Sequence, residues 1–276
     1  MGNYTPAQNS VSATLRYLRK EASPGEVHAG YSDGTGLHNA DFMDIVVPIR
    51  DSRCDRHQPS ISRNGFELLT DNVKRTLTQG NEIALKSYEE DLRKLIIHTL
   101  GASYVLPFQT TWRASNINPA SPAHMRAPVT VVHNDYTETQ ALRKARELYE
   151  TWNLFPSKTN RPFAIITAWR SAEKTVEAYP LAVCDASTIS TNDLVDVERK
   201  REQSVHMLQL ARYNPLHQWS YFRNMTEEET LLFVCYDSRF ASSRANTLHS
   251  AFLDGAELNG NYVRKSIETR CLVLFE

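Results

Sequence analysis

The chain has 276 residues, of which 41% are hydrophobic and 23% are charged. This composition is typical of a globular protein and excludes a disordered or collagen-like chain. Lys and Arg number 31 against 32 Asp and Glu, so the net charge of −1 argues against a nucleic-acid binder. No apolar run approaches the roughly 18 residues that a membrane-spanning helix needs, so we expect no membrane partner.

The N-terminus and the cysteines favour a cytoplasmic enzyme. The first 20 residues lack the apolar stretch of a secretory signal. Pro6 stands where an N-myristoylation motif has Ser or Thr, so we expect no such lipid. The four cysteines form no Cys-x-x-Cys pair. Isolated cysteines in a chain without a signal are typical of reduced thiols.

Two helices and a loop-rich start are predicted. Residues 1–80 are rich in Gly, Asp, Ser and Pro around one apolar run at 45–49, which predicts a loop-rich wrapping segment with a short strand or two. Apolar residues recur at helical spacing over 81–100, and Gly101 supplies a stop. A second amphipathic helix is expected over 138–152.

The remainder consists mainly of short apolar segments separated by turns. Strands are predicted at 103–108, 129–133, 163–169, 181–184, 206–210, 218–222, 230–236 and 269–275. Residues 193–203 are highly charged and are expected to form a loop or a short helix. Many short strands in series are typical of a sandwich or barrel such as a jelly roll. The expected fold class is therefore α+β, mainly β, with helices and a jelly-roll core over 81–276 in a single domain.

A candidate metal site begins at His133-Asn134-Asp135, at the end of an apolar segment. In a strand, residues i and i+2 point to the same face, so this imidazole and carboxylate can converge. His249 follows much later in the β-rich half. Two His and one carboxylate form the facial triad of non-haem Fe(II) oxygenases, which leaves positions open for a co-substrate and dioxygen.

A candidate anion site opens the last strand. Arg264, Ser266, Glu268 and Arg270 share one face by the period of two. A guanidinium binds a carboxylate through two parallel hydrogen bonds, and a neighbouring hydroxyl adds another. Arg264 with Ser266 is therefore suited to the distal end of a dicarboxylate. Arg270 is either a second anion contact or an inward charge that is paired within the protein.

From about Tyr88 onward several sequence blocks occur in a fixed order. They are Gly101-Ala-Ser-Tyr-Val-Leu-Pro-Phe108, Val132-His-Asn-Asp-Tyr-Thr137, Arg161-Pro-Phe-Ala-Ile-Ile-Thr-Ala-Trp-Arg170, Pro180-Leu-Ala-Val-Cys-Asp185, Arg212-Tyr-Asn-Pro-Leu-His-Gln-Trp-Ser-Tyr-Phe222, Leu232-Phe-Val-Cys-Tyr-Asp-Ser238 and Arg264-Lys-Ser-Ile-Glu-Thr-Arg270. In these blocks the sequence resembles a fungal hydroxylase/desaturase family that includes gibberellin desaturase-like proteins and relatives of the cephalosporin methoxylase accessory component. Leu248 and Ser171 depart from the family pattern, which has Pro at both places.

The resemblance implies an Fe(II)/2-oxoglutarate-dependent oxygenase with a double-stranded β-helix core, a jelly-roll or cupin-like fold with flanking helices. It implies that His133, Asp135 and His249 bind Fe(II), that Arg264 and Ser266 hold 2-oxoglutarate, and that dioxygen is the oxidant. The substrate would be a small-molecule intermediate of secondary metabolism. Its C–H bond would be hydroxylated, desaturated or closed into a ring.

Other residues have both a functional and a structural interpretation. Arg170 follows an apolar strand and either contacts 2-oxoglutarate or a substrate acid, or pairs with an acid such as Asp185. His217, Trp219 and Tyr221 alternate along one strand, where they either line the substrate pocket or pack in the core. Arg113 is a further candidate for substrate binding.

Two alternatives to this function stay open. The first keeps iron but uses no 2-oxoglutarate, or catalyses a non-redox reaction. The second is a non-catalytic accessory component of a biosynthetic complex, because the family includes one. A homodimer also stays open.

Overall fold

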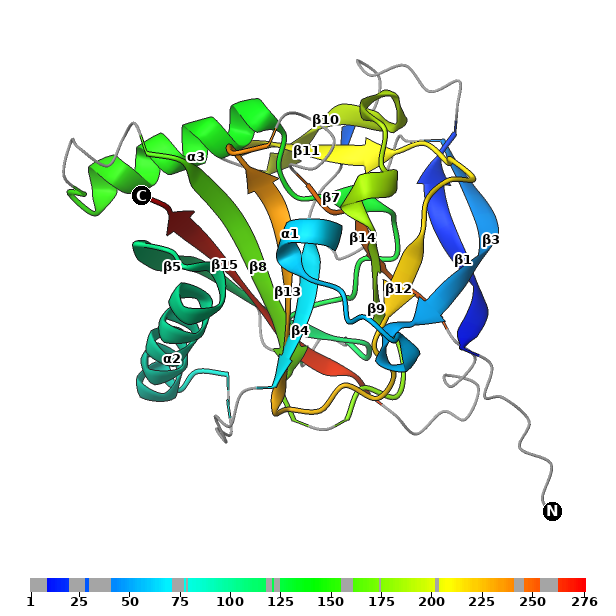
Figure 1. Cartoon of the computed structure of the whole chain (residues 1–276), viewed down its shortest axis with the longest axis horizontal. Helices are drawn as coiled ribbons and strands as arrows, with labels where there is room; N and C mark the ends of the chain where they lie inside the picture. The colour runs from blue at the N-terminus through cyan, green and yellow to red at the C-terminus, as the bar shows by residue number, and fades with distance from the viewer. Residues whose placement is uncertain are drawn as a thin grey trace.

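The computed structural model describes residues 9–19, 28–29, 41–70, 77, 79–117, 121, 125–154, 161–173, 175–201, 204–240, 246–253 and 263–276. Two curled β-sheets pack against each other, with two long helices at the periphery (Figure 1). The predicted mainly β class is confirmed.

The larger sheet has nine strands in the order β1-β3-β12-β9-β14-β7-β11-β10-β2. Its strands are β1 (Ser10–Leu18), β2 (His28–Ala29), β3 (Phe42–Asp51), β7 (His133–Asn134), β9 (Leu181–Cys184), β10 (Leu194–Arg201), β11 (Ser204–Ala211), β12 (Trp219–Tyr221) and β14 (His249–Ala251). Most of its pairs are antiparallel, but β12 runs parallel to β3 and β10 runs parallel to β2.

The smaller sheet has six strands in the order β4-β13-β8-β15-β5-β6. They are β4 (Phe66–Thr70), β5 (Tyr104–Ala114), β6 (Met125–Arg126), β8 (Phe163–Ser171), β13 (Glu229–Asp237) and β15 (Lys265–Leu274). The central run β5-β15-β8-β13 belongs to this sheet, and β7-β14-β9-β12 belongs to the other. These eight strands form a double-stranded β-helix, the predicted jelly roll.

Three α-helices flank the sheets: α1 (Ile61–Asn64), α2 (Glu82–Leu100) and α3 (Glu138–Thr151). The Asn81 side chain accepts a hydrogen bond from Ala84 N at the start of α2, and Gly101 ends that helix at φ 62°. The Thr137 side chain caps α3 in the same way, through Gln140 N. Both helices that the sequence predicted are confirmed.

The core has an inner and an outer part. Inward residues of both sheets pack with one side of α3, including Trp169, Val183, Phe233 and Leu272. The opposite face of the six-stranded sheet packs against α2, outside the jelly roll (Figure 1). Alternate residues of β15 therefore belong to different cores: Leu272 lies inside, whereas Cys271 faces α2.

Three local predictions differ from the structure. The described part of segment 1–80 holds three regular strands of five to ten residues, because small or apolar residues of β1 such as Ala13 and Leu15 alternate with exposed polar ones. The Gly-rich stretch at 31–38 lies outside the described residues.

Residues 194–201 form β10 rather than a loop or a helix, since Val195 and Val197 are buried between exposed charged residues. The predicted strand at 129–133 is reduced to β7 and a bridge from Val131 to Arg16.

Gly65 joins α1 to β4 at a position that excludes a side chain. Its φ is +80°, and an added Cβ would collide with Thr247 Oγ1 and lie 2.9 Å from Ala186 Cβ. Gly65→Ala is expected to lower the free energy of unfolding by about 1–3 kcal/mol, measured by urea denaturation. Gly101 has a similar φ of +62° but open space around it, so Gly101→Ala is the control for backbone strain alone. Equal losses in the two variants would contradict the predicted steric cost.

Candidate active site

Strand pairing brings the two predicted imidazole ligands together. His133 on β7 lies directly opposite His249 on β14, so both side chains project from the same face of the sheet. Their ring centroids are 4.2 Å apart. Phe233 of the facing sheet covers the His249 ring at a centroid distance of 4.6 Å. Both His residues are buried.

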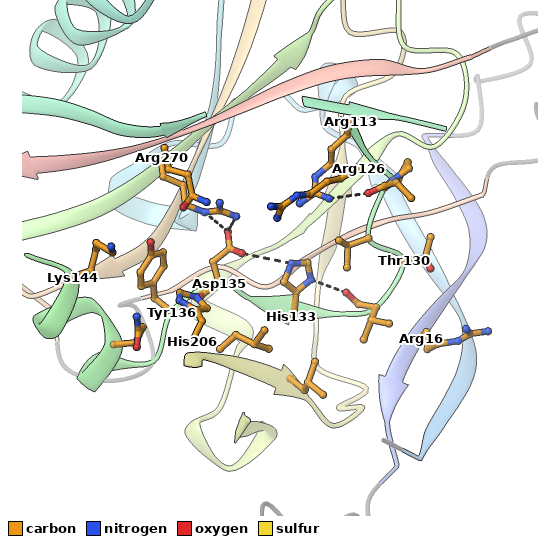
Figure 2. Close-up of a pocket in the computed structure, with 18 of the residues that line it drawn as sticks. Arg16, Arg113, Arg126, Thr130, His133, Asp135, Tyr136, Lys144, His206 and Arg270 are labelled. Atoms are coloured by element: carbon orange, nitrogen blue, oxygen red, sulfur yellow. Dashed lines mark hydrogen bonds and ion pairs between the residues drawn. The ribbon is translucent and has the colours of Figure 1, made fainter. Parts of the chain in front are cut away.

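Asp135 completes a cluster of three metal-ligating groups just after β7. His133 Nε2 lies 3.9 Å from Asp135 Oδ1, and His249 Nε2 lies 3.9 Å from Asp135 Oδ2. One ligand atom from each residue lies within 4.8 Å of the other two. Figure 2 shows the Asp135 carboxylate beside the His133 ring. The three side chains therefore form a group that could hold one metal ion.

Backbone carbonyls fix the orientation of both imidazoles. His133 Nδ1 lies 2.8 Å from Val131 O, and His249 Nδ1 lies 3.3 Å from Thr247 O. When Nδ1 carries the proton and donates it to the carbonyl, Nε2 is left with a lone pair directed at the cluster. Burial, reinforced by the neighbouring His249, lowers the pKa of His133 to about 3, and burial also lowers the pKa of His249. Both imidazoles are therefore neutral near pH 7, as metal ligands must be.

A buried chain of alternating charges holds the carboxylate ligand. Arg270 donates two hydrogen bonds to Asp135 Oδ2, at 3.0 Å from Nε and 2.7 Å from Nη2. Arg270 Nη2 also lies 3.1 Å from Glu268 Oε1. Glu268 in turn accepts two hydrogen bonds of 2.9 Å from Arg113, whose Nη1 donates to Ala127 O at 2.8 Å. This series of ion pairs thus connects Asp135 to the backbone of the cavity wall.

These charges decide the ionisation of both acids. Burial opposes the charge of Asp135, but the Arg270 guanidinium outweighs it and holds the pKa of the carboxyl well below its usual range. Burial likewise opposes the charge of Glu268, but Arg113 and Arg270 lower its pKa to about 2. Both acids are carboxylates at neutral pH, so Asp135 is ready to act as an anionic ligand.

The cluster opens into a cavity of about 630 Å³. Its wall is polar on the side of β5, β15 and α3, and apolar on the side of β11 and the segment before β7. The described lining residues are Arg16, Gln109, Arg113, Ser115, Arg126, Ala127, Pro128, Val129, Thr130, Val131, His133, Asp135, Tyr136, Gln140, Arg143, Lys144, Glu147, Tyr179, Val205, His206, Leu208, Leu210 and Arg270. Cavities of this size accommodate drug-sized ligands.

The remaining predicted anion-binding residues are placed differently from one another. Arg264, just before β15, and Ser266, on its inward face, are buried, and neither is among the residues that line the cavity. Arg264 hydrogen-bonds to the carbonyl of Tyr179, a cavity-lining residue, and its guanidinium lies 5.3 Å from the Trp169 ring. Arg170 is directed to the outer face of β8, where it contacts Glu227 O and the Tyr88 ring. The structure does not bring Arg170 to the cavity.

The predicted aromatic pocket residues on β12 and just before it also lie away from this cavity. His217 contacts Tyr17 and Asp193, at 3.2 Å each. Trp219 donates a hydrogen bond to the Tyr17 hydroxyl, and Tyr221 packs edge-on against Phe252. Tyr17, Trp219, Tyr221 and Phe252 belong to one hydrophobic cluster, and none of them lines the cavity. Arg113, by contrast, lines the cavity.

Sequence reasoning missed three groups that contact Asp135 or its ion partners. Glu268 was placed on the inward face but received no role, because its two arginine partners come from different strands. Cys235 Sγ lies 3.8 Å from Asp135 Oδ2. His206 Nε2 lies 2.8 Å from the backbone carbonyl of Asp135. Of these three, only Glu268 could have been expected from the sequence, because the period of two places it on the inward face of β15.

The lowered imidazole pKa values predict acid sensitivity of the metal-free protein. An unfolded His binds a proton near pH 6.5, so between about pH 6.5 and 3 the unfolded chain binds more protons than the folded one. Above about pH 6.5 the two imidazoles therefore do not lower the free energy of unfolding. Below that pH the free energy of unfolding falls by at most about 1.4 kcal/mol per pH unit for each buried imidazole. Urea denaturation at pH 7 and pH 5 measures this loss, and His133→Asn is expected to lose less than the parent. An equal loss in both proteins would contradict the prediction.

Comparison with known proteins identifies the relatives of this chain. A family model described as an oxidoreductase/YMDC permease-like domain matches residues 15–274. Hydroxylase/desaturase efuI of Hormonema carpetanum is 30% identical, over 97% of this chain and 96% of its own length. The Fe(II)/2-oxoglutarate-dependent dioxygenase nvfI of Aspergillus novofumigatus is 24% identical, over 93% of this chain and 90% of its own length.

A solved structure confirms the fold. The iron and alpha-ketoglutarate-dependent endoperoxidase NvfI superposes with a TM-score of 0.84 at 21% identity, covering 98% of this chain and 99% of that one. Within the described residues, no helix has the length and apolarity needed to cross a membrane. The chain belongs to the oxidoreductase family whose model it matches over nearly its whole length, together with the fungal hydroxylase/desaturase proteins, some of which are named iron- and 2-oxoglutarate-dependent dioxygenases.

Proposed function

We propose that this chain is an Fe(II)/2-oxoglutarate-dependent oxygenase that oxidises a C–H bond of a small-molecule intermediate of secondary metabolism. The convergence of His133, Asp135 and His249 beside a cavity that His133 and Asp135 line carries the proposal. Two neutral imidazoles and one carboxylate are a donor set that suits Fe(II) and leaves positions open. With 2-oxoglutarate and dioxygen, such an ion supplies an oxidant able to remove hydrogen from carbon.

In the proposed function, the side chains of the protein hold the metal ion and orient the groups that bind it. His133 and His249 offer Nε2 because their Nδ1 atoms face backbone carbonyls. Asp135 offers Oδ1 because Oδ2 accepts both hydrogen bonds from Arg270. The burial of these groups keeps bulk water away from the reacting atoms. Both sheets contribute to the site, which supports a single oxygenase domain over 1–276.

We assign Arg264 and Ser266 to the distal carboxylate of 2-oxoglutarate. Both are almost fully buried, Arg264 just before β15 and Ser266 on its inward face. Among the described residues, Ser266 Oγ is a buried hydroxyl without a hydrogen-bond partner. Such a group is costly unless a ligand satisfies it. Arg270 is instead occupied by Asp135 and Glu268.

The Ser266 hydroxyl therefore gives a prediction with two readouts. Ser266→Ala is expected to weaken 2-oxoglutarate binding about tenfold or more, because a hydrogen bond to a charged group is lost. The stability of the ligand-free protein is expected to stay unchanged or to rise slightly, since no protein contact is removed. Calorimetric titration of the iron-loaded protein with 2-oxoglutarate under exclusion of dioxygen measures the first effect, and urea denaturation the second. Unchanged binding would contradict the assignment.

The proposed function is tested by anaerobic titration with Fe(II), followed by aerobic incubation with 2-oxoglutarate and candidate substrates. We expect one Fe(II) per chain and iron-dependent formation of succinate. Iron dependence without any effect of 2-oxoglutarate would favour an iron enzyme of another reaction class. A protein that binds no iron would favour a non-catalytic accessory component.

The free thiols also bear on the compartment. All four cysteines are free, and Cys184, Cys235 and Cys271 are buried. Burial raises the pKa of the Cys184 thiol to about 12, so it stays protonated and unreactive. Reduced, unpaired cysteines are typical of the cytosol, which is the compartment that we propose.

A further inference from the structure

One stripe of α3 faces the cavity, and its composition differs from the rest of the helix. Ala141, Ala145 and Leu148 pack in the core. The lining residues of the helix are Gln140, Arg143, Lys144 and Glu147, and they recur at spacings of three and four. Tyr136 extends the stripe by one turn toward Asp135, which it follows in the sequence. Figure 2 shows Tyr136 and Lys144 at the end of the cavity opposite Arg16, with Asp135 and His133 between them.

The stripe presents hydrogen-bonding groups that the described residues do not satisfy. Gln140 is only 4% exposed, and neither its side-chain amide nor the Tyr136 hydroxyl hydrogen-bonds to a described residue. Both residues line the cavity, so both groups can serve a ligand. Arg143 is exposed to solvent as well as to the cavity and adds the donors of a guanidinium. The stripe is therefore rich in donors.

Arg143 is a cavity-lining cation that has no carboxylate partner among the described residues. Among the described lining residues the carboxylates are Asp135 and Glu147. Asp135 is paired with Arg270, and Glu147 with Lys144 at 2.7 Å. Within the described part of the chain, no carboxylate forms an ion pair with Arg143. An anionic group entering from solvent would find its charge partner there.

Another part of the cavity wall is apolar. It is formed by Val129 and Val131 before β7 and by Val205, Leu208 and Leu210 on β11. A ligand that contacts both parts of the wall gains most when its carbon skeleton is buried against the apolar part and a polar group accepts hydrogen bonds from the stripe.

We propose that the substrate is an apolar carbon skeleton that carries a carboxylate, with the carboxylate bound by Arg143 and Gln140 and the skeleton lying against β11. This inference rests on the proposed function, in which 2-oxoglutarate has separate anchors at Arg264 and Ser266. Held at its acidic end by α3, such a substrate extends past Tyr136 toward the metal ligands.

The test compares matched acids and alcohols, so that only the carboxylate differs. The probes are dehydroabietate with dehydroabietinol, a rigid skeleton, and dodecanoate with dodecanol, a flexible one. Binding is measured by calorimetry on protein loaded with Fe(II) and saturated with 2-oxoglutarate, under exclusion of dioxygen. Arg143→Met removes the charge, and Arg146→Met is the control, because Arg146 is exposed on the same helix but does not line the cavity.

We expect at least one acid to bind about fivefold or more tightly than its alcohol, and this preference to disappear in Arg143→Met but not in Arg146→Met. The preference should also shrink with increasing salt. Equal affinities, no binding of either compound in both pairs, or competition of the acid with 2-oxoglutarate would overturn the proposal. The measurement involves no turnover, and binding of iron and of 2-oxoglutarate is recorded before the probes are added. Failure of the proposed function would appear in those first titrations and is therefore distinguished from failure of this inference.

Discussion

Replacing His133 or His249 with alanine is expected to abolish Fe(II) binding and the formation of succinate. Loss of a group that merely orients a metal ligand weakens binding about 10- to 100-fold, so loss of a ligand is expected to cost more than about a hundredfold. Each variant leaves one imidazole and Asp135, which is already engaged by Arg270. Anaerobic titration with Fe(II) measures the affinity, and release of succinate measures the turnover.

The control for this experiment is His98→Ala. His98 is exposed on α2, outside the jelly roll, and is expected to leave both readouts unchanged. The alanine variants at 133 and 249 should still fold, because each removes a buried neutral side chain rather than one member of an ion pair. If one of them binds iron as the parent does while the other loses it, the shared site of these two imidazoles is refuted.

The metal cluster could be predicted because its geometry follows from elementary rules. His133 and Asp135 are two residues apart at the end of a strand, and that spacing alone places them on the same side. His249 is different, since nothing local in its sequence distinguishes it from the other His residues. Its place opposite His133 results from the pairing of β14 with β7, two strands far apart in the chain. It was reached through the order of the motifs and the family resemblance.

The aromatic residues of β12 show where the sequence was insufficient. Their alternation predicted one common face, but not what covers that face. The structure extends the jelly roll with β1 and β3, and β3 pairs in parallel with β12. Tyr17 of β1 thereby reaches His217 and Trp219. Because the N-terminal segment was expected to be mostly loop, no partner for these side chains could be foreseen.

The inward charges of β15 were predicted as a set but not as pairs. The period of two placed Arg264, Ser266, Glu268 and Arg270 on one face, and in the structure Glu268 and Arg270 contact each other there. Which anion each arginine meets depends on the neighbouring strands and on the loop after β7. For Arg270 the sequence left both a bound anion and a partner within the protein open, and its partners are Asp135 and Glu268.

Replacing Arg270 with methionine is therefore expected to destabilise the metal-free protein strongly. The side chain of Arg270 is 10% exposed, that of Asp135 14% and that of Glu268 11%. Removing the central cation leaves two carboxylates close together in a buried site, with Arg113 as the remaining partner of Glu268. Breaking a buried ion pair in this way costs about 3–5 kcal/mol. Urea denaturation at pH 7.5 in the presence of a chelator measures the loss.

Two further variants separate charge from geometry. Arg270→Lys keeps the cation but cannot reproduce the two hydrogen bonds to Asp135 Oδ2, so an intermediate loss is expected. Arg146→Met, on the exposed side of α3, controls for the removal of an arginine as such. In Arg270→Met the pKa of Asp135 should rise, because the cation that opposes the effect of burial is gone. Stability of Arg270→Met equal to that of the parent would show that the pair with Asp135 does not form. Without that pair, Asp135 would have no fixed orientation toward the two imidazoles.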